Sequence, residues 1–492
     1  MKKSKMSSND LNNTNNKVLF RLESPKSPFN KEINNYLEAL TLNTNYNSIY
    51  TNEYIFNEYI CGYMDGDGTF YIGVNYDLKL KELKENVENR YLSEDELYKL
   101  WNEFEYKNDL TLYKNQMRQV YPRFGVHCHI MDEDLLMKMF NQLSMSEKNI
   151  RKSYRRNTDN KIISVYYYMD NINLMVEKIF PFFDKYQTLT NKYYSYNKFK
   201  FSLLKFMETN DKDKFALSSM TMNNNIPMPN LSIPKKNINL FYILGLFEAE
   251  GNVSWDKTKN SLTWSISQNI MSELVMKNLK TYLNNLDIDP NTPEEIKMNL
   301  SKKDFVNMYV KKNNMLELAI TNLDFLHYKL FYNMDRYNFW LIGYKRMSLT
   351  LFRMISTLYM RGVHTYPEVK EFINFLFNNV INKHLTLIEM LNIISLEKMN
   401  YFLNYDPIYN EFKSYRTNSQ KGGVFMYDKN KVFIGYISSM KNTEIYFAKL
   451  GYLHGAKRTS MGKYSVNNKL FLNNYYLYKS TIHDWKGENI IS

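Results

Sequence analysis

The 492-residue sequence contains only two cysteines, Cys61 and Cys128, and their separation matches no metal-ligand spacing. So few cysteines exclude a disulfide-stapled scaffold and favour a reducing compartment. No stretch approaches the roughly 18 uninterrupted apolar residues of a membrane-spanning helix, so we expect no membrane partner. The polar stretch Met1–Lys17 has no apolar segment, which excludes a secretory signal, and no arginine, which makes it a poor mitochondrial presequence.

Glycine and proline are scarce, at 16 and 11 residues, and acidic residues are fewer than basic ones. The net charge of +13 and the pI near 9.1 indicate a polyanionic partner or a solvated basic surface. The abundant Asn, Lys, Ile and Tyr have A/T-rich codons, so we expect an organelle-encoded mitochondrial protein. The length allows two or three domains, and a hydrophobic fraction of 44% allows a sizeable core.

One internal repeat stands out. The segment Glu58–Gly68 (EYICGYMDGDG) is echoed by Phe241–Gly251 (FYILGLFEAEG), and both end in acid, small residue, acid and glycine. Each copy is followed by two alternating strand patterns, a helical pattern, more strand and a last helix. The repeat therefore predicts an α+β protein with two pseudo-symmetric αββαββα units.

The small residues of the repeat predict close helix packing. If each motif is a helix, Gly62 and Gly66 lie on one face, and Gly245 and Ala249 occupy the matching positions. Small residues four apart allow two helix backbones to approach closely. We therefore expect the motif helices to pack on one another with their C-terminal ends together.

That packing would place Asp67 and Glu250 side by side. Two adjacent carboxylates repel unless a cation lies between them, and oxygen ligands suit Mg²⁺. The C-terminal carbonyls of Gly66 and Ala249 would add partial negative charge at the same place. A single DGDG segment is often only a helix end and a turn. The duplication of the motif is what favours a metal site.

The two motifs resemble those of monomeric LAGLIDADG homing endonucleases, and the resemblance covers about residues 54–346. The segments Ile179–Lys192 and Leu318–Leu326, and Phe339 with Trp340, are also similar to that family. The resemblance implies that Asp67 and Glu250 bind the metal. It also implies two saddle-shaped antiparallel sheets that lie in the major groove of double-stranded DNA.

In such a fold the outward residues of the strands would contact base edges. Strand alternation gives these predicted DNA contacts: Tyr71, Asn75, Arg123, His127, Ser254, Thr263, Ser265 and Ser267. Any one of them could equally be part of a solvated strand face.

Other catalytic groups are implied by the resemblance alone. Gln268 matches a glutamine near the metal-bound waters, whereas the first copy has Cys128 or His129 there. A basic residue near the cleaved phosphate is also implied. Lys192 and Arg336 are the candidates, with Lys185 as a rival, and each could instead be a phosphate anchor or a surface charge.

We expect five regions along the chain: a polar arm (1–50), a first unit (51–205, with an insertion at about 77–118), a linker (206–238), a second unit (239–346) and a C-terminal extension (347–492). Within the extension, about 420–475 is similar to the small modular DNA-binding repeats appended to homing endonucleases. Its basic turn carries Lys457, Arg458 and Lys463, although unrelated hairpins show the same pattern.

Together these features predict a monomeric, site-specific homing endonuclease that makes a staggered double-strand break with Mg²⁺. The alternative is an RNA maturase that assists splicing of a group I intron, alone or alongside cleavage. Maturases of this kind can lose the two acids, so the presence of both favours the nuclease. A third alternative is a decayed element without activity. The N-terminal arm has no apolar exon-like segment, which favours a free-standing reading frame.

Overall fold

The computed structural model describes residues 52–74, 120–212, 236–337, 341–360, 367–403, 424–437 and 474–479, apart from positions 293 and 431, and a few isolated residues between these ranges. The predicted arm and most of the predicted insertion lie outside the described residues. So do most of the linker, Asn75, and the basic turn with Lys457, Arg458 and Lys463.

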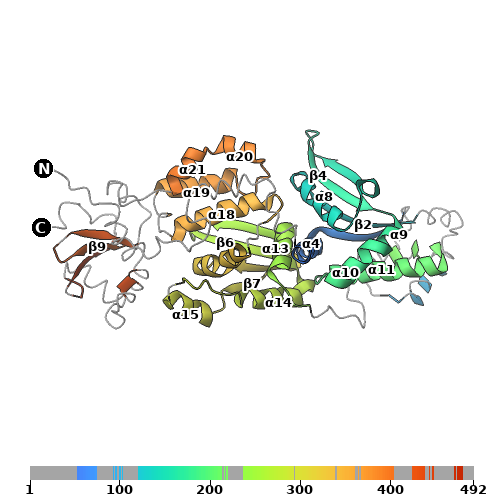
Figure 1. The fold of residues 1–492 in the computed structure, drawn as a ribbon, viewed down its shortest axis with the longest axis horizontal. Coiled ribbons are helices and arrows are strands. Elements are labelled where there is room, and N and C mark those ends of the chain that lie inside the picture. Colours follow the sequence, from blue (N-terminus) through green and yellow to red (C-terminus); the bar gives the residue numbers. More distant parts are fainter. Residues whose placement is uncertain are drawn as a thin grey trace.

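The first unit runs through helix, two strands, helix, two strands and helices (Figure 1). Its four strands form one antiparallel sheet in the order β1-β2-β4-β3. Its main elements are α4 (Glu53–Asp67), β1 (Gly68–Val74), β2 (Val120–His129), α8 (Glu133–Gln142), β3 (Arg151–Arg156), β4 (Ile162–Met169), α10 (Phe180–Tyr186) and α11 (Lys192–Thr209).

The second unit repeats this order, and its antiparallel sheet has the equivalent order β5-β6-β8-β7. The predicted α+β fold of two αββαββα units is therefore confirmed. Its main elements are α13 (Leu240–Glu250), β5 (Gly251–Asp256), β6 (Ser261–Asn269), α14 (Glu273–Asn284), α15 (Glu294–Lys302), β7 (Val306–Lys311), β8 (Met315–Ile320), α17 (Tyr332–Arg336) and α18 (Lys345–Met360).

Helix α18 has in the second unit the place that α11 has in the first. Helix α11 lies against β1, and α18 lies against the equivalent strand β5. The boundary expected at 346 thus falls inside this helix, and we place the end of the second unit at Met360. From Ser348 onward α18 is buried throughout, so it lacks the polar face by which a terminal helix of a unit is usually recognised.

Both motif helices begin at an asparagine and end at a glycine. The side chain of Asn52 accepts a hydrogen bond from Ile55 N (3.3 Å), and that of Asn239 accepts one from Tyr242 N (2.9 Å). These side chains satisfy backbone donors that the first helical turn leaves unpaired. Gly68 and Gly251 are extended, so a strand follows each helix directly.

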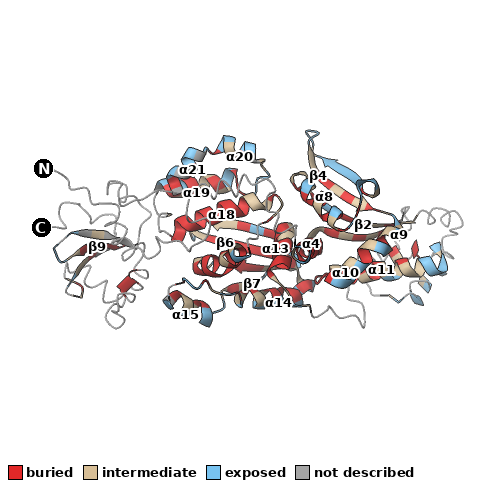
Figure 2. Cartoon of the chain, viewed as in Figure 1, coloured by how far each residue is buried: buried red, intermediate tan, exposed pale blue. Residues whose placement is uncertain are grey.

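Helices α4 and α13 pack with their backbones in contact at the centre of the molecule, where Figure 2 shows both as buried. A Cβ atom on Gly62 would lie 2.0 Å from the Tyr242 carbonyl oxygen, and one on Gly245 would lie 2.0 Å from that of Tyr59. No side chain fits there. The two glycines therefore set the distance between the units.

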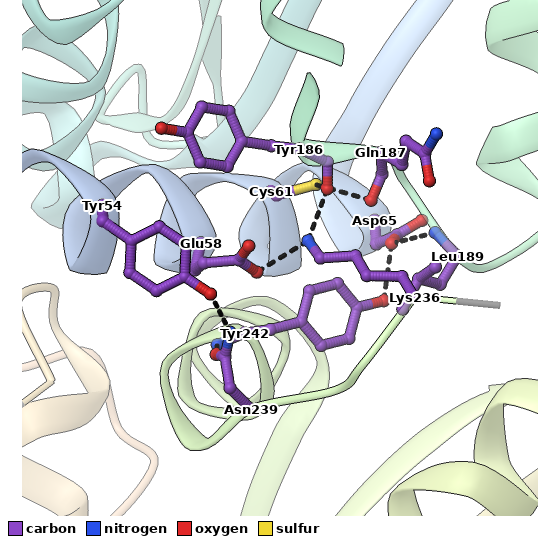
Figure 3. A network of polar contacts seen from close by, with 10 residues as sticks. All are labelled: Tyr54, Glu58, Cys61, Asp65, Tyr186, Gln187, Leu189, Lys236, Asn239 and Tyr242. Carbon is purple, nitrogen blue, oxygen red and sulfur yellow. Dashed lines mark hydrogen bonds and ion pairs between the residues drawn. The ribbon is translucent and has the colours of Figure 1, made fainter. Parts of the chain in front are cut away.

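A buried polar network joins the linker to both motif helices (Figure 3). Lys236 forms an ion pair with Glu58 at 2.6 Å and also donates to the Tyr186 carbonyl. The Cys61 thiol donates to the carbonyls of Tyr186 (3.3 Å) and Gln187 (3.0 Å). Burial raises the pKa of this thiol well above its usual value, so Cys61 is a structural and unreactive residue.

The C-terminal extension adds three helices beside α18, namely α19 (Pro367–Asn379), α20 (Leu387–Ile393) and α21 (Leu396–Leu403). Trp255 of β5 donates to the Tyr359 hydroxyl of α18 (2.8 Å) and stacks on Phe377 of α19 at 5.9 Å between ring centroids. These contacts attach the helical layer to the second unit.

A small antiparallel sheet follows, with the order β10-β9-β11 and the strands β9 (Val424–Asp428), β10 (Phe433–Ile437) and β11 (Tyr475–Lys479). Among the helices that the structure describes, none has the length and apolar character needed to cross a bilayer.

Replacing Gly62 with alanine is expected to destabilise the protein by about 1–3 kcal/mol, because the added methyl group must push the Tyr242 carbonyl away. Urea unfolding would measure this, with the exposed Asn141→Ala variant of α8 as control. An unchanged midpoint for Gly62→Ala would contradict the close packing of α4 on α13.

Candidate active site

The first acid of each motif is a buried structural group. Asp65 accepts hydrogen bonds from the backbone N–H groups of Leu189 (2.6 Å) and Thr190 (3.0 Å). It also accepts from the hydroxyls of Thr190 (2.6 Å) and Tyr242 (2.5 Å). Burial raises the pKa of Asp65, and these four donors act in the opposite direction. Asp65 thus fixes the loop that leads into α11.

Glu248 has the same role in the second unit. It accepts from the backbone N–H groups of Ile342 (3.2 Å), Gly343 (3.1 Å) and Lys345 (3.1 Å), and so fixes the loop that leads into α18. The Tyr59 hydroxyl also donates to it, at 2.6 Å. Tyr59 and Tyr242 hold matching positions in the two motifs, so each motif helix donates a tyrosine hydroxyl to the first acid of the other.

The two fixed loops deliver two lysines to the ends of the motif helices. Lys192 is the first residue of α11, and its ammonium group donates to the Gly68 carbonyl. Lys345 is the first residue of α18, and its ammonium group donates to the carbonyls of Ala249 (2.6 Å) and Phe247 (3.3 Å). The pseudo-symmetry of the units thus extends to these lysines.

The second acids, Asp67 and Glu250, are half-buried at the paired helix ends. Burial raises the pKa of Asp67, while Lys345, Lys192 and a hydrogen bond from Tyr63 act to lower it. Burial also raises the pKa of Glu250, and the charge of Asp67 adds to this effect. The two carboxylates therefore repel one another within a shared field of two lysines. Burial lowers the pKa of both lysines.

This donor set fits a divalent cation. Among the described residues no group of three or more His, Cys, Asp and Glu side chains could hold a metal ion. Mg²⁺ commonly uses only one or two carboxylates and completes its coordination with water and substrate phosphates. Asp67 and Glu250 provide these two carboxylates. The Ala249 carbonyl, which was expected to add partial negative charge at this place, already accepts a hydrogen bond from Lys345.

The structure does not place Arg336 near the carboxylates. Arg336 ends α17 and forms an exposed ion pair with Asp287 at 2.5 Å. The neighbouring Tyr337 packs on Phe241 at the start of α13, at the opposite end of that helix from Glu250. Lys345 replaces Arg336 as the candidate for the basic residue near the cleaved phosphate. The signal that could have identified it is its position at the start of the last helix of its unit, as for Lys192.

The rival Lys185 lies in α10, exposed, with its ammonium group 4.9 Å from the ring centroid of Tyr186. Gln268 and Cys128 hold matching positions on β6 and β2, and both are buried. Asp132 and Asp67 are among the charges that, after burial, raise the pKa of the Cys128 thiol. The first unit thus has a neutral thiol where the second has an amide.

The outward face of the first sheet is aromatic and cationic. The guanidinium of Arg123 lies 4.2 Å from the ring centroid of Tyr168 and 4.6 Å from that of Tyr121. His127 is exposed, with Nε2 3.0 Å from the Ser164 hydroxyl. Tyr71 pairs with Arg123 across the strands and shares this face.

Strand β3 extends the same face, although the sequence pattern did not identify its residues. All six residues of β3 are exposed, and Arg151 and Arg155 pair with Tyr168 and Ser164 of β4. The segment RKSYRR has no alternation of apolar and polar residues, which is why the pattern of a half-buried strand is absent.

The outward face of the second sheet is mostly neutral and polar. Ser254, Thr263 and Ser267 are half-buried there. Ser265 is only 2% exposed, and its hydroxyl lies 3.5 Å from the Asn252 carbonyl, so Ser265 is removed from the predicted contact surface. The acidic Glu317 on this face is paired with Lys311 at 2.5 Å.

Asp132 is a further buried acid at the junction of the units. It accepts a hydrogen bond from Tyr344 N at 2.5 Å. Burial raises its pKa to about 7, and the charge of Glu248 adds to this effect. The equivalent residue of the second unit is Ser272, so this acid has no symmetric partner.

The raised pKa of Asp132 predicts a pH effect on stability. A folded-state pKa of about 7 against an ordinary value of 3.8 means that stability falls as the pH rises between these values. Asp132→Asn keeps an acceptor for Tyr344 and removes the charge. We expect its melting temperature to decline less than that of the wild type between about pH 4 and about pH 7. Asp134→Asn, exposed in α8, serves as control, and equal declines in all three proteins would refute this assignment.

Comparison with known proteins agrees with this architecture. The sequence profile of the family described as "LAGLIDADG endonuclease" matches residues 101–202, and that of the "LAGLIDADG-like domain" matches residues 237–326. A relative from Saccharomyces cerevisiae, "Uncharacterized mitochondrial protein RF1", is 29% identical over 421 residues, which cover 81% of this chain and 84% of the relative.

Among solved structures, I-SmaMI bound to uncleaved DNA target is 17% identical, with a TM-score of 0.44 over 66% of this chain and 98% of that one. I-GzeII in complex with DNA target is 15% identical, with a TM-score of 0.44 over 67% of this chain and 99% of that one. The two profile matches lie one in each αββαββα unit, and the second includes its motif helix. Each of the two αββαββα units of this chain therefore matches a LAGLIDADG family profile.

Proposed function

We propose that this chain is a site-specific homing endonuclease that hydrolyses both strands of a DNA duplex at the paired ends of α4 and α13. The observation that carries the proposal is the meeting of Asp67 and Glu250 at these ends, each within the field of Lys192 and Lys345. The two LAGLIDADG profile matches support an endonuclease in general. The pairing of two half-buried acids with two lysines supports metal-dependent hydrolysis of a phosphodiester.

In this mechanism Asp67 and Glu250 would hold Mg²⁺, and a bound Mg²⁺ would neutralise charge on the scissile phosphate and lower the pKa of water. Lys192 and Lys345 act on the negative charge that develops on the phosphate oxygens. Their ammonium groups are held by the Gly68 and Ala249 carbonyls, so little reorganisation is needed when DNA binds. Tyr63 donates to Asp67 and orients its carboxylate.

The two sheets supply the proposed duplex-binding surface. In the first half-site, the arginines of β2 and β3 can bind phosphates and guanine edges, and tyrosines lie between these arginines. In the second half-site, serine, threonine and asparagine side chains can form hydrogen bonds with bases. We propose a mitochondrial site of action, because the yeast relative is described as mitochondrial and the codon bias agrees.

The cleavage proposal is tested by incubating the protein with mitochondrial DNA and Mg²⁺ and sequencing the ends. Asp67→Asn and Glu250→Gln are expected to abolish cleavage because each removes a metal ligand. Lys345→Met is expected to slow cleavage about 100-fold, whereas Arg336→Met should stay within about threefold of the wild type, since its exposed ion pair contributes little.

Survival of cleavage in the Asp67→Asn, Glu250→Gln double variant would overturn the mechanism. The alternative function, assistance to group I intron splicing, is independent of these carboxylates. A splicing defect on deletion, with no break in DNA and no effect of the double variant, would favour that function.

The charge difference between the sheets predicts unequal salt dependence. Arg151→Gln or Arg155→Gln should each reduce the slope of log affinity against log salt by about 1, because one phosphate contact is lost. Ser254→Ala and Thr263→Ala should lower affinity without changing the slope. Binding to a duplex spanning the mapped break, measured in EDTA, gives both quantities. Identical slopes in all four variants would show that β3 does not contact phosphates.

A further inference from the structure

The turn between α19 and α20, residues 380–386, reaches the centre of the molecule from the C-terminal extension. The backbone N–H of Asn382 donates to the Ser348 hydroxyl (3.1 Å). Its side-chain amide donates to the Asn252 side chain (3.1 Å) and to the Val253 carbonyl (2.9 Å). Asn382 and His384 have φ angles of 59° and 51°, a left-handed conformation that these contacts hold in place.

His384 lies against residues of both units. Its ring stacks on His129 at 4.1 Å between centroids and on Tyr344 at 4.8 Å, with interplanar angles of 27° and 19°. Its backbone N–H donates to the Tyr344 hydroxyl. His129 ends β2 in the first unit, and Tyr344 directly precedes Lys345 in the second.

The groups that face this stack keep its imidazoles neutral. His129 Nδ1 accepts from Met131 N (3.3 Å), which leaves the proton on Nε2. Burial and the neighbouring His384 lower the pKa of His129 to about 4. Burial and Lys345 lower the pKa of His384. Asp132 is also linked to the stack, through its hydrogen bond with Tyr344 N.

Tyr344 is therefore held from three sides. Asp132 accepts from its backbone N–H, His384 N–H donates to its hydroxyl, and the His384 ring covers its face. The next residue is Lys345, whose backbone is bound by Glu248 and whose ammonium group lies on the Ala249 carbonyl. Because Tyr344 directly precedes Lys345, a displacement of Tyr344 would be passed on to the Lys345 backbone.

We propose that His384 is a positioning residue for Lys345: it clamps Tyr344 against the first unit, so that the C-terminal helical layer completes the candidate active site. This inference rests on the proposed function for its effect on cleavage. The contact itself can be tested without any DNA.

The first experiment follows histidine ring signals by NMR during a pH titration of the ¹⁵N-histidine-labelled full chain. Removing the Lys345 charge with Lys345→Met is expected to raise the pKa of His384, because that charge is one cause of its lowered value. Lys398→Met, a lysine of α21 in the same helical layer, should leave it unchanged. No change with Lys345→Met would overturn the proposal, whether or not the protein cuts DNA.

The second experiment measures single-turnover cleavage and DNA affinity for His384→Ala and His384→Phe. His384→Ala is expected to slow cleavage about 10-fold or more, since small displacements of a catalytic group are costly, while affinity changes less than about twofold. His384→Phe keeps an aromatic ring on Tyr344 and should restore most of the rate. Ile388→Ala, 73% exposed in the adjacent α20, is the matched control.

The pH profile separates positioning from a purely structural role. In the wild type, protonation of the stacked imidazoles at low pH should separate His384 from His129 and Lys345 and reduce the rate. In His384→Phe the part of this loss that comes from protonation of His384 should disappear. An unchanged rate in His384→Ala, or a loss confined to affinity, would overturn the proposal. Absence of cleavage by the wild type would instead overturn the proposed function, and the histidine titration would still decide the contact.

Discussion

The whole arrangement depends on direct backbone contact between α4 and α13. At Gly62 and Gly245 even a methyl group would lie 2.0 Å from a carbonyl oxygen of the other helix. Because the backbones touch, Tyr59 and Tyr242 can each reach the first acid of the opposite motif. These acids in turn bind the loops before α11 and α18. The positions of the two lysines thus follow from helix packing, although neither lysine is in a motif helix.

The two units share this framework but differ in the groups that surround it. Tyr63 donates to Asp67, whereas the second motif has Leu246 at the equivalent position. Asp132 corresponds to Ser272, and Cys128 corresponds to Gln268. The acids Asp67 and Glu250 themselves differ in length, so the two sides of the centre present different donors and charges to any substrate.

The C-terminal extension is part of this centre as well as an addition to the second unit. Helix α19 is packed on Trp255 of β5, and the turn that follows crosses to His129 of the first unit. A layer outside the duplicated fold thereby joins both units next to Lys345. This also breaks the pseudo-symmetry, since among the described residues no equivalent turn covers Lys192.

The sequence by itself determined the duplicated motif and the α+β units with their order of helices and strands, and it predicted Asp67 and Glu250 as the central acids. These features come from local patterns. A period of two residues marks a strand, a period of about 3.6 residues marks a helix, and a regular spacing of small residues marks close helix packing, so each can be recognised within a short segment. Only the tertiary structure showed that Lys345 lies at the end of a motif helix and that Arg336 forms an exposed ion pair elsewhere. It also showed that the last helix of the second unit extends to Met360, that β3 continues the outward face, and that His384 stacks on Tyr344. Each of these depends on contacts between residues far apart in the chain, such as His129 and His384. Such contacts leave no local pattern, because the physical constraint lies in the packing and not in neighbouring residues.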